Sequence, residues 1–366
     1  MVFAKEKIIG KLFIRADSTP RIGTGHIMRC IALAQAWQDR GGKVIFISHC
    51  ESDALQGRIK DEGFRLIDIE VPHPDRGDLK KTLFFIEFEL RQSTQDSTGN
   101  ALQPWVVLDG YHFDPDYQKA IKEAGYHLLV IDDQVHHSRY YADILLNQNI
   151  HAPGLQYTCD KDTVQLLGCD YALLRREFLQ YKNRKRKIPQ KATKILVTMG
   201  GADPDNVMLK VVQAINKIND PGLEVKIVAG PANPNIESLS AELSGVNYHY
   251  ELLSNVTDMP GLMAWADIAV SAGGSTCWEI GFFGVPFLVV ILAENQKDIA
   301  KGLADKGVAK CLGWYNEITS DQIAFELESI IEDVEQLKKM SDIGLQLIDG
   351  LGKGRVIDPF YEKKTP

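Results

Sequence analysis

Short apolar, β-branched runs alternate along the chain with stretches in which apolar residues recur every three or four positions. Residues 11–16 (KLFIRA) and 43–48 (KVIFIS) are typical of buried strands. Residues 27–38 lie between them and carry one apolar helical stripe: Ile27, Cys30, Ile31, Ala34 and Trp37. Strands that alternate with helices predict a parallel sheet with helices on both faces.

The alternation runs through two successive halves of the chain. In the first half we expect further strands at 64–69, 105–109, 127–132 and 143–147, and a helix at 114–124. A basic segment without apolar periodicity, YKNRKRKIPQKA (181–192), then predicts a linker between domains. In the second half the pattern predicts strands at 194–200, 224–230, 247–250, 268–274, 286–291 and 308–314, and helices at 205–217, 235–244, 258–266, 275–283, 295–306 and 321–349.

The expected fold class is therefore α/β, with two doubly wound, Rossmann-like domains that face a central cleft. Their predicted bounds are 1–180 and 193–350, followed by a tail at 351–366. Residues 91–100 predict a mobile loop tip. In sheets of this kind, ligands bind outside the carboxyl ends of the strands, so motifs at those ends are the candidates for function.

Composition narrows the class of function. The chain has 366 residues, 41 Lys and Arg against 49 Asp and Glu, and a net charge of −8, which argues against a nucleic-acid partner. Six scattered cysteines without a C-x-x-C pair indicate reduced thiols. Lys7 and Lys11 interrupt the N-terminal apolar residues, so we expect no signal peptide, no membrane anchor and a cytoplasmic protein.

The first candidate motif is RIGTGHIMRC (21–30), which follows the first predicted strand. Gly23 and Gly25 give the backbone freedom, and a helix begins near His26. The positive end of a helix suits an anion and disfavours imidazolium, so His26 would stay neutral and able to accept a proton. The alternative is a tight turn in which His26 only caps the helix. The spacing does not fit G-x-G-x-x-G, so a dinucleotide site is not expected.

The second motif is SAGGSTCWE (271–279). Two glycines, two hydroxyls and a helix start after a strand form a candidate phosphate cradle: Gly273, Gly274, Ser275 and Thr276. Glu279, one turn into the helix, could accept hydrogen bonds from sugar hydroxyls. The alternative is a helix cap, in which Ser275 and Glu279 act as an imperfect capping box.

Other strand ends carry weaker candidates. In TMGGADP (198–204), Gly200 and Gly201 form a turn, and we expect Asp203 as helix N-cap with Pro204 as the first helical residue. Asp17, Asp109 and Tyr111 end strands of the first domain. The segment DDQVHH (132–137) suggests metal ligands, but adjacent histidines diverge on a helix, and we expect no metal site and no cofactor.

Taken together, the motifs resemble a known family. RADSTPRIGTGHIMRCIALA, LDGYHFD, IDDQVHHSRYYADILLNQN, LLGCDYALLRREF, TMGGADPDN and AGGSTCWEIGFFGVP…ENQ run in order from about residue 12 to about 310. They are similar to the UDP-2,4-diacetamido-2,4,6-trideoxy-β-L-altropyranose hydrolase family of pseudaminic acid biosynthesis. The GGST…E segment alone is shared with a wider group of GT-B glycosyltransferases.

The resemblance implies a GT-B fold, UDP held mainly by the second domain, and metal-independent hydrolysis that inverts the anomeric carbon. It implies that His26 activates the water, that Tyr111 lies near the sugar and that Glu279 binds the ribose. Further residues of the matched motifs are candidate substrate-binding residues: Arg15, Asp17, Gly23, Gly25, Asp109, Gly200, Gly201, Asp203, Gly273, Gly274, Ser275, Thr276, Asn295 and Gln296.

The chain has extra length in 73–104, which the sequence does not explain. It also has DGYH at 109–112 where that family more often has D-H-Y-G, and this departure leaves the substrate open. A related diamino-trideoxy sugar nucleotide is therefore an alternative substrate. A GT-B glycosyltransferase and a non-catalytic nucleotide-sugar-binding protein are alternative functions. The sequence does not define the oligomeric state, although a monomer is compatible with it.

Overall fold

The computed structural model describes residues 10–19, 22–70, 73–92, 103–201, 203–230 and 233–362, without the side chains of 361 and 362. The chain forms two compact units. Unit 1 comprises Met1–Arg176 together with Leu351–Pro366, and unit 2 comprises Glu177–Gly350. Each unit is built on one parallel sheet, which confirms the α/β class.

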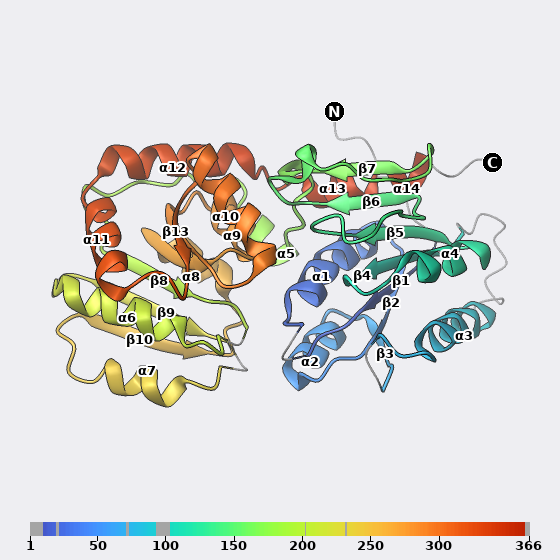
Figure 1. The fold of residues 1–366 in the computed structure, drawn as a ribbon, viewed down its shortest axis with the longest axis horizontal. Helices are drawn as coiled ribbons and strands as arrows, with labels where there is room; N and C mark the ends of the chain where they lie inside the picture. Colours follow the sequence, from blue (N-terminus) through green and yellow to red (C-terminus); the bar gives the residue numbers. More distant parts are fainter. Residues whose placement is uncertain are drawn as a thin grey trace. The chain divides into compact units, whose positions relative to one another are not determined.

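Unit 1 contains a seven-stranded sheet in the order β3-β2-β1-β4-β5-β6-β7 (Figure 1). The pairings between these strands are parallel, with Ile14 opposite Phe46 on one side and Val107 on the other. The order places β1 and β4 side by side at the point where the chain changes direction across the sheet. The strands are β1 (Lys11–Ala16), β2 (Lys43–Ser48), β3 (Arg65–Asp68), β4 (Trp105–Asp109), β5 (His127–Ile131), β6 (Ile144–Asn147) and β7 (Val164–Leu167).

Helices cover both faces of this sheet because alternate strand residues point to opposite sides. Leu12 and Ile14 share a core with α1, α2, α13 and α14, whereas Phe13 belongs to a second core with α3 and α4. The helices of unit 1 are α1 (Gly25–Gln38), α2 (Asp53–Asp61), α3 (Asp78–Arg91), α4 (Pro115–Glu123), α13 (Gly352–Ile357) and α14 (Pro359–Glu362), with short turns η1 (Ala152–Gly154) and η2 (Cys169–Tyr171).

The C-terminal segment differs from the predicted tail. Residues 352–362 form α13 and α14 and pack on unit 1. Val356, Ile357 and Phe360 are buried there, and the Phe360 ring contacts Trp37 and Trp105 at centroid distances of 5.2 and 4.2 Å. Burial of these apolar side chains explains why the segment folds.

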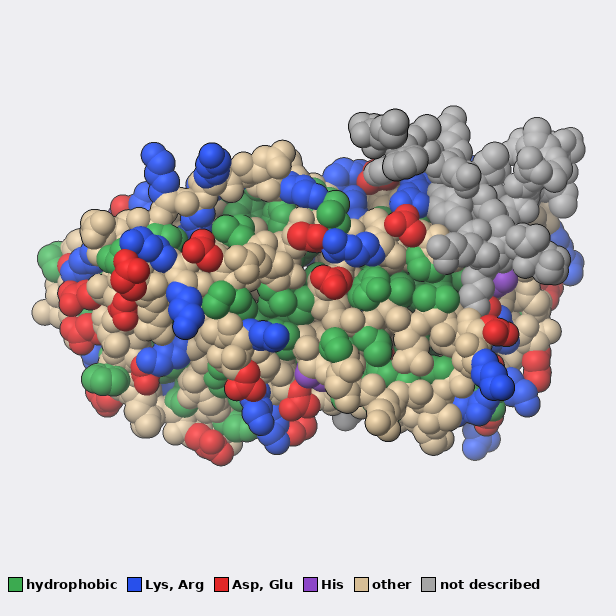
Figure 2. Space-filling view, turned by 90° about the horizontal axis from the view of Figure 1, so that it is seen from above, with side chains coloured by type: hydrophobic (Ala, Val, Ile, Leu, Met, Phe, Trp, Pro, Cys, Tyr) green, Lys and Arg blue, Asp and Glu red, His purple; other side chains and the backbone are tan. Residues whose placement is uncertain are grey.

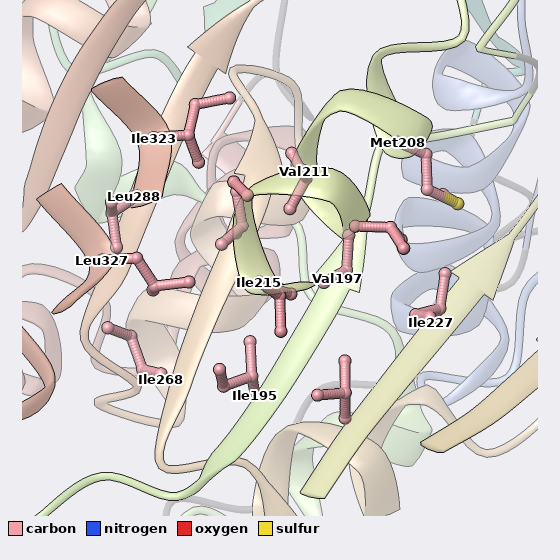
Figure 3. Close-up of a cluster of buried hydrophobic side chains, with 14 of the residues drawn as sticks. Ile195, Val197, Met208, Val211, Ile215, Ile227, Ile268, Leu288, Ile323 and Leu327 are labelled. Carbon is pink, nitrogen blue, oxygen red and sulfur yellow. The ribbon is translucent and has the colours of Figure 1, made fainter. Parts of the chain in front are cut away.

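Unit 2 contains a six-stranded parallel sheet in the order β10-β9-β8-β11-β12-β13 (Figure 1). Figure 3 shows part of its core, where Val211 and Ile215 of α6 and Leu327 of α11 pack with strand residues such as Ile195. The strands are β8 (Lys194–Thr198), β9 (Glu224–Ala229), β10 (His249–Ser254), β11 (Ile268–Ala272), β12 (Phe287–Ile291) and β13 (Ala309–Trp314). The helices are α5 (Arg176–Leu179), which begins at the last residue of unit 1, α6 (Val207–Ile218), α7 (Ile236–Glu242), α8 (Met259–Trp265), α9 (Thr276–Phe282), α10 (Glu294–Lys306), α11 (Ser320–Ile331) and α12 (Val334–Leu347).

Two segments of unit 2 differ from the sequence-based expectation. The helix expected at 321–349 is divided into α11 and α12, because Asp333 accepts a hydrogen bond from the Gln336 N–H and starts a new helix. The predicted linker 181–192 has neither helix nor strand and packs within unit 2. There Ala192 is fully buried, and Arg186 donates to the carbonyls of Ala266 and Asp267.

The surface and the thiols agree with the composition. Figure 2 shows basic and acidic side chains interspersed on the visible face, without a broad basic patch among the residues drawn in colour. All six cysteines are free thiols, and four of them are buried. Within the described ranges, no helix combines the length and the apolar character that crossing a bilayer requires. The predicted loop tip at 91–100 lies mostly outside the described residues.

Candidate functional site

The carboxyl edge of the unit 1 sheet is rich in histidine. Of the nine histidines in the chain, only His127 and His249 begin strands. The others lie in segments that follow strands of unit 1: His26, His49, His73, His112, His136, His137 and His151. Because the strands are parallel, these segments gather at one edge of the sheet.

His26 is oriented by a carboxylate from the end of β4. Its Nδ1 lies 2.5 Å from Asp109 Oδ1. The Asp109 side chain is fully buried, whereas the His26 side chain keeps 11% of its surface exposed. An ionised carboxylate only accepts hydrogen bonds, so the 2.5 Å contact favours the hydrogen on Nδ1 over the longer, 3.2 Å approach of Arg29 Nη2 to the same atom. In that tautomer Nε2 of the neutral ring has a free lone pair. His26 is the second residue of α1 and not its N-cap, so the capping alternative does not describe it.

Arg29 balances the charge beneath this histidine. One turn further along α1, its guanidinium donates to Asp109 at 2.6 and 2.7 Å and to Asp133 at 2.9 and 3.0 Å. Burial alone would raise the pKa of Asp109, but Arg29 and His26 together hold that pKa well below its usual value. The same carboxylates raise the pKa of Arg29 well above its usual value, against the effect of burial. Asp109 therefore stays ionised and keeps the His26 ring in one tautomer.

Tyr111 contacts both His26 and Asp133, and Asp133 lies in the loop that follows β5. Its hydroxyl donates to Asp133 Oδ2 at 2.7 Å, and its ring makes an edge contact with the His26 ring at 5.1 Å. Asn149 also donates to Asp133, at 2.7 Å. The predicted residues Asp109 and Tyr111 thus come together with His26, and their contacts favour a role for Asp109 in orienting the histidine.

Arg15 and Asp17 form a second buried network beside the first. The Arg15 guanidinium donates to Asp17 and, at 2.7 Å, to Asp78 at the start of α3. The three side chains have no exposed surface. Asp17 also accepts from the His49 N–H at 2.8 Å. Complete burial favours a positioning role for Arg15 and Asp17 over direct contact with a substrate. Asp78 gives helix α3, which lies in the described part of the extra length, a contact with this network.

His112 extends into this second network. Its ring stacks on His73 at 5.1 Å, and its Nε2 lies 3.9 Å from Asp17 Oδ2. Burial, together with the neighbouring His73, lowers the pKa of His112 from 6.5 to about 4.

We predict that the free energy of unfolding falls as the pH is lowered from 6.5 to about 4, because the unfolded chain binds a proton on His112 that the folded chain does not bind. His112→Gln should flatten this slope, as measured by urea unfolding at several pH values across the window. Equal slopes for wild type and variant would show that His112 does not contribute.

The Gly-Gly turn of unit 2 joins the end of β11 to α9. Ser275 occupies the N-cap position of α9, and its side chain makes no capping hydrogen bond. The capping-box alternative is therefore not observed. In the described ranges, the N–H groups of Gly274, Ser275 and Thr276 donate no hydrogen bond, whereas the Gly273 N–H donates to the Val290 carbonyl. Three neighbouring N–H groups of this kind suit a phosphate.

Gln296 supports the turn from the first turn of α10. Its side-chain oxygen accepts from the N–H groups of Gly273 and Leu292 at 3.2 and 3.0 Å. A Cβ atom at Gly273 would lie 3.0 Å from the Gln296 Cβ, whereas one at Gly274 would meet nothing within 4 Å. Close packing against Gln296 thus favours glycine at 273, because a larger residue would have to push Gln296 aside. Gln296 therefore supports the Gly-Gly turn through packing and hydrogen bonds. Glu279 lies on α9, which follows β11, and Asn295 lies on α10, which follows β12.

We predict that Gly273→Ala destabilises the protein by about 1–3 kcal/mol, because the added methyl group overpacks the contact with Gln296. Gly274→Ala is the matched control and should cost less than about 1 kcal/mol, since the space there is open. The two unfolding free energies, measured in urea, make the comparison. Equal values would contradict the proposed packing.

The turn after β8 differs in detail from the prediction. Gly200 adopts φ +88°. Gly230 packs closely on Gly201, so a Cβ atom at Gly230 would lie 2.1 Å from the Gly201 carbonyl oxygen. However, α6 begins at Val207 and not at Pro204, with Asn206 as its N-cap residue. Asp203 is buried and still accepts from the Val207 and Met208 N–H groups, so it caps the helix from a distance.

Within the described residues, no group of three or more histidine, cysteine, aspartate or glutamate side chains has the geometry of a metal site. The adjacent histidines of DDQVHH lie in a loop, where Asp132 binds His136 and the His137 ring contacts Tyr140. Sequence reasoning missed Arg29. A charged residue inside the apolar stripe of α1, three positions after His26, is the signal that could have found it.

A family comparison concerns unit 2. Residues 194–348 match the model of the glycosyltransferase family 28 C-terminal domain. These residues contain both glycine turns described above.

Comparison with solved structures shows that the chain has the GT-B fold, as predicted. MurG from Acinetobacter baumannii superposes with a TM-score of 0.63 at 16% identity, over 96% of this chain and 99% of that one. The UDP-GlcNAc 2-epimerase from Neisseria meningitidis, solved with UDP-GlcNAc, superposes with a TM-score of 0.60 at 14% identity, over 97% of this chain and 100% of that one.

Two curated proteins are similar over most of the chain. The spore coat polysaccharide biosynthesis protein SpsG of Bacillus subtilis is 26% identical, covering 96% of this chain and 98% of SpsG. The UDP-2,4-diacetamido-2,4,6-trideoxy-β-L-altropyranose hydrolase of Campylobacter jejuni is also 26% identical, covering 81% of this chain and 97% of the hydrolase.

Proposed function

We propose that the protein hydrolyses a UDP-diacetamido-trideoxyhexose at its anomeric carbon, releasing UDP and the free sugar, in pseudaminic acid or related nonulosonic acid biosynthesis. The observation that carries the proposal is the contact between His26 and Asp109, which leaves Nε2 of an accessible imidazole ready to accept a proton. The similarity to the Campylobacter jejuni hydrolase supports this substrate class.

In the proposed reaction, His26 Nε2 takes a proton from water while the water oxygen bonds to the anomeric carbon. The bond between that carbon and the β-phosphate oxygen breaks, and its electron pair leaves with UDP. Attack opposite the leaving group inverts the anomeric configuration. Asp109 stabilises the imidazolium that forms and keeps the ring oriented, as a buried carboxylate does in other acid–base pairs. UDP is a good leaving group, so protonation of the leaving oxygen is not essential.

Unit 2 is proposed to hold UDP. The N–H groups at 274–276 would bind the β-phosphate and stabilise the charge that develops on it. Glu279, in the first turn of α9, would accept hydrogen bonds from the ribose hydroxyls. Residues 194–348, which match the glycosyltransferase domain, contain both groups and support this assignment.

We predict that Glu279→Ala weakens the binding of UDP by about 10-fold, since a hydrogen bond from a sugar hydroxyl to a carboxylate contributes about 1.5 kcal/mol or more. Isothermal titration calorimetry with UDP measures the effect. Glu294→Ala, on α10, is the comparison variant and should leave the dissociation constant within about two-fold. An unchanged constant for Glu279→Ala would remove the ribose contact.

A glycosyltransferase is the second candidate, because residues 194–348 match a glycosyltransferase domain. Incubation with UDP-diacetamido-trideoxyhexoses without acceptor separates the two functions. A hydrolase releases one UDP for each sugar nucleotide consumed, whereas a transferase turns over only when an acceptor hydroxyl is added. Binding of the sugar nucleotide without turnover in either condition would indicate a non-catalytic binding protein.

A further inference from the structure

A second histidine–carboxylate pair lies on the carboxyl edge of the unit 1 sheet, and the proposed hydrolysis leaves it unused. His136 Nδ1 is 2.9 Å from Asp132 Oδ2. The His136 ring stacks on Tyr111 at a centroid distance of 4.1 Å and an angle of 13°. Tyr111 also contacts His26, so both imidazoles share one aromatic neighbour.

The Asp132 carboxylate, like that of Asp109, accepts several hydrogen bonds. Its two oxygens accept from the Gln134 and Val135 N–H groups at 2.8 and 2.7 Å, and from the Tyr140 hydroxyl at 2.8 Å, in addition to His136. Burial would raise the pKa of Asp132, but the bonds from His136 and Tyr140 outweigh it and lower the pKa to about 2. Asp132 is therefore an acceptor only, and the hydrogen of neutral His136 lies on Nδ1.

The backbone before His136 is strained. Val135 has φ +53°, a left-handed conformation that a β-branched residue rarely adopts. The hydrogen bond from its N–H to Asp132 maintains this conformation. Strain of this kind persists where the surroundings impose it, and it often marks a functional loop. Here its result is the position of the next side chain, His136.

This arrangement leaves the other nitrogen of His136 available. The His136 side chain keeps 23% of its surface exposed, against 4% for Asp132. Within the part of the chain that the structure describes, the His136 ring makes its hydrogen bond through Nδ1, and Nε2 makes none. A strained loop, a saturated carboxylate and an aromatic stack thus hold an accessible imidazole beside the Tyr111–His26 contact.

We propose that His136 binds the sugar of the sugar nucleotide, with Nε2 accepting a hydrogen bond from a hydroxyl or amide N–H substituent of the ring. The Tyr111 ring contacts the His26 ring on one side and the His136 ring on the other. The sugar substituent that binds His136 is therefore not the anomeric carbon, on which His26 acts. His136 is then a determinant of sugar specificity. This inference rests on the proposed function only in taking a UDP-sugar as the ligand.

The test uses two variants of His136, each of which keeps a polar group near one of the two ring nitrogens. Glutamine places its terminal amide near the position of Nε2, whereas asparagine reaches only the position of Nδ1. In full-length protein that also carries His26→Ala to prevent turnover, calorimetry measures binding of UDP and of UDP-2,4-diacetamido-2,4,6-trideoxy-β-L-altropyranose. His136→Asn should weaken the UDP-sugar by about 10-fold and His136→Gln by less than about 3-fold, with UDP unchanged.

His137→Asn is the matched control, because His137 is the neighbouring residue and its ring packs on Tyr140. It should leave both dissociation constants within about two-fold.

Affinity for the UDP-sugar that is unchanged in both His136 variants would overturn the inference. So would a larger loss with glutamine than with asparagine, since that order indicates that only the bond to Asp132 matters. If the His136 effect is present but the wild-type protein releases no UDP, the hydrolysis proposal fails and this contact stands. If the wild-type protein releases UDP and the His136 effect is absent, the hydrolysis proposal stands and the contact with His136 fails.

Discussion

Replacement of His26 by alanine is expected to lower kcat for UDP release by about 10²- to 10⁴-fold, the usual contribution of a positioned general base. The reason is the loss of Nε2, the lone pair that the contact with Asp109 keeps free. Affinity for the UDP-sugar should change little, because the nucleotide groups are proposed to bind unit 2. Steady-state kinetics for kcat and calorimetry for the dissociation constant measure the two quantities.

His49→Ala provides the control for this prediction. His49 lies on the same carboxyl edge, but its ring nitrogen is 3.4 Å from the exposed Glu51 and it contacts no residue of the His26 network. We expect a kcat within about two-fold of the wild-type value. A kcat for His26→Ala that is also within a few-fold of wild type would remove His26 from the role of base.

The second large effect is on stability. Arg29→Met should destabilise unit 1 by about 3–5 kcal/mol, because it leaves the buried carboxylates of Asp109 and Asp133 without their counter-charge. Hydrogen–deuterium exchange with mass spectrometry assigns the loss to a unit, since protection should fall in peptides from β1, β4 and β5 and remain in those from unit 2.

Arg139→Met is the matched control for charge removal. Arg139 pairs with Asp160 at the surface, where both side chains are roughly half exposed. Such pairs contribute about 0–1 kcal/mol, so protection should be almost unchanged. If Arg29→Met and Arg139→Met have equal effects, the buried network does not stabilise unit 1 as described.

The sequence predicts the fold well where one strand or helix determines its own pattern. Strands 11–16 and 43–48 have the predicted bounds, because their apolar residues are buried on both faces of a parallel sheet. The pattern missed α2, whose apolar stripe is only Leu55 and Ile59. It also missed α3, which buries polar residues such as Thr82 and Glu89 and exposes Phe84 and Phe88, so its apolar positions do not mark the buried face. It also missed the return of 352–362 to unit 1, since that packing depends on Trp37 and Trp105, which are distant in sequence.

The candidate site was predicted only in part. The motif at 21–30 identified His26, but the role of Asp109 depends on a contact across 83 residues, and that of Asp133 on a contact with Arg29 across 104 residues. No local pattern encodes such contacts. The sequence indicates only metal binding as a role for His136, because its contact with Asp132 and the positive φ of Val135 exist only in the folded chain.

The central claim is that water attacks the anomeric carbon of a UDP-diacetamido-trideoxyhexose. The most direct measurement is the reaction of UDP-2,4-diacetamido-2,4,6-trideoxy-β-L-altropyranose in oxygen-18 water without acceptor, with mass spectrometry of the nucleotide and immediate NMR of the sugar anomer. We expect unlabelled UDP and a free sugar of inverted configuration. UDP that carries oxygen-18, or the absence of UDP until an acceptor is added, would contradict it.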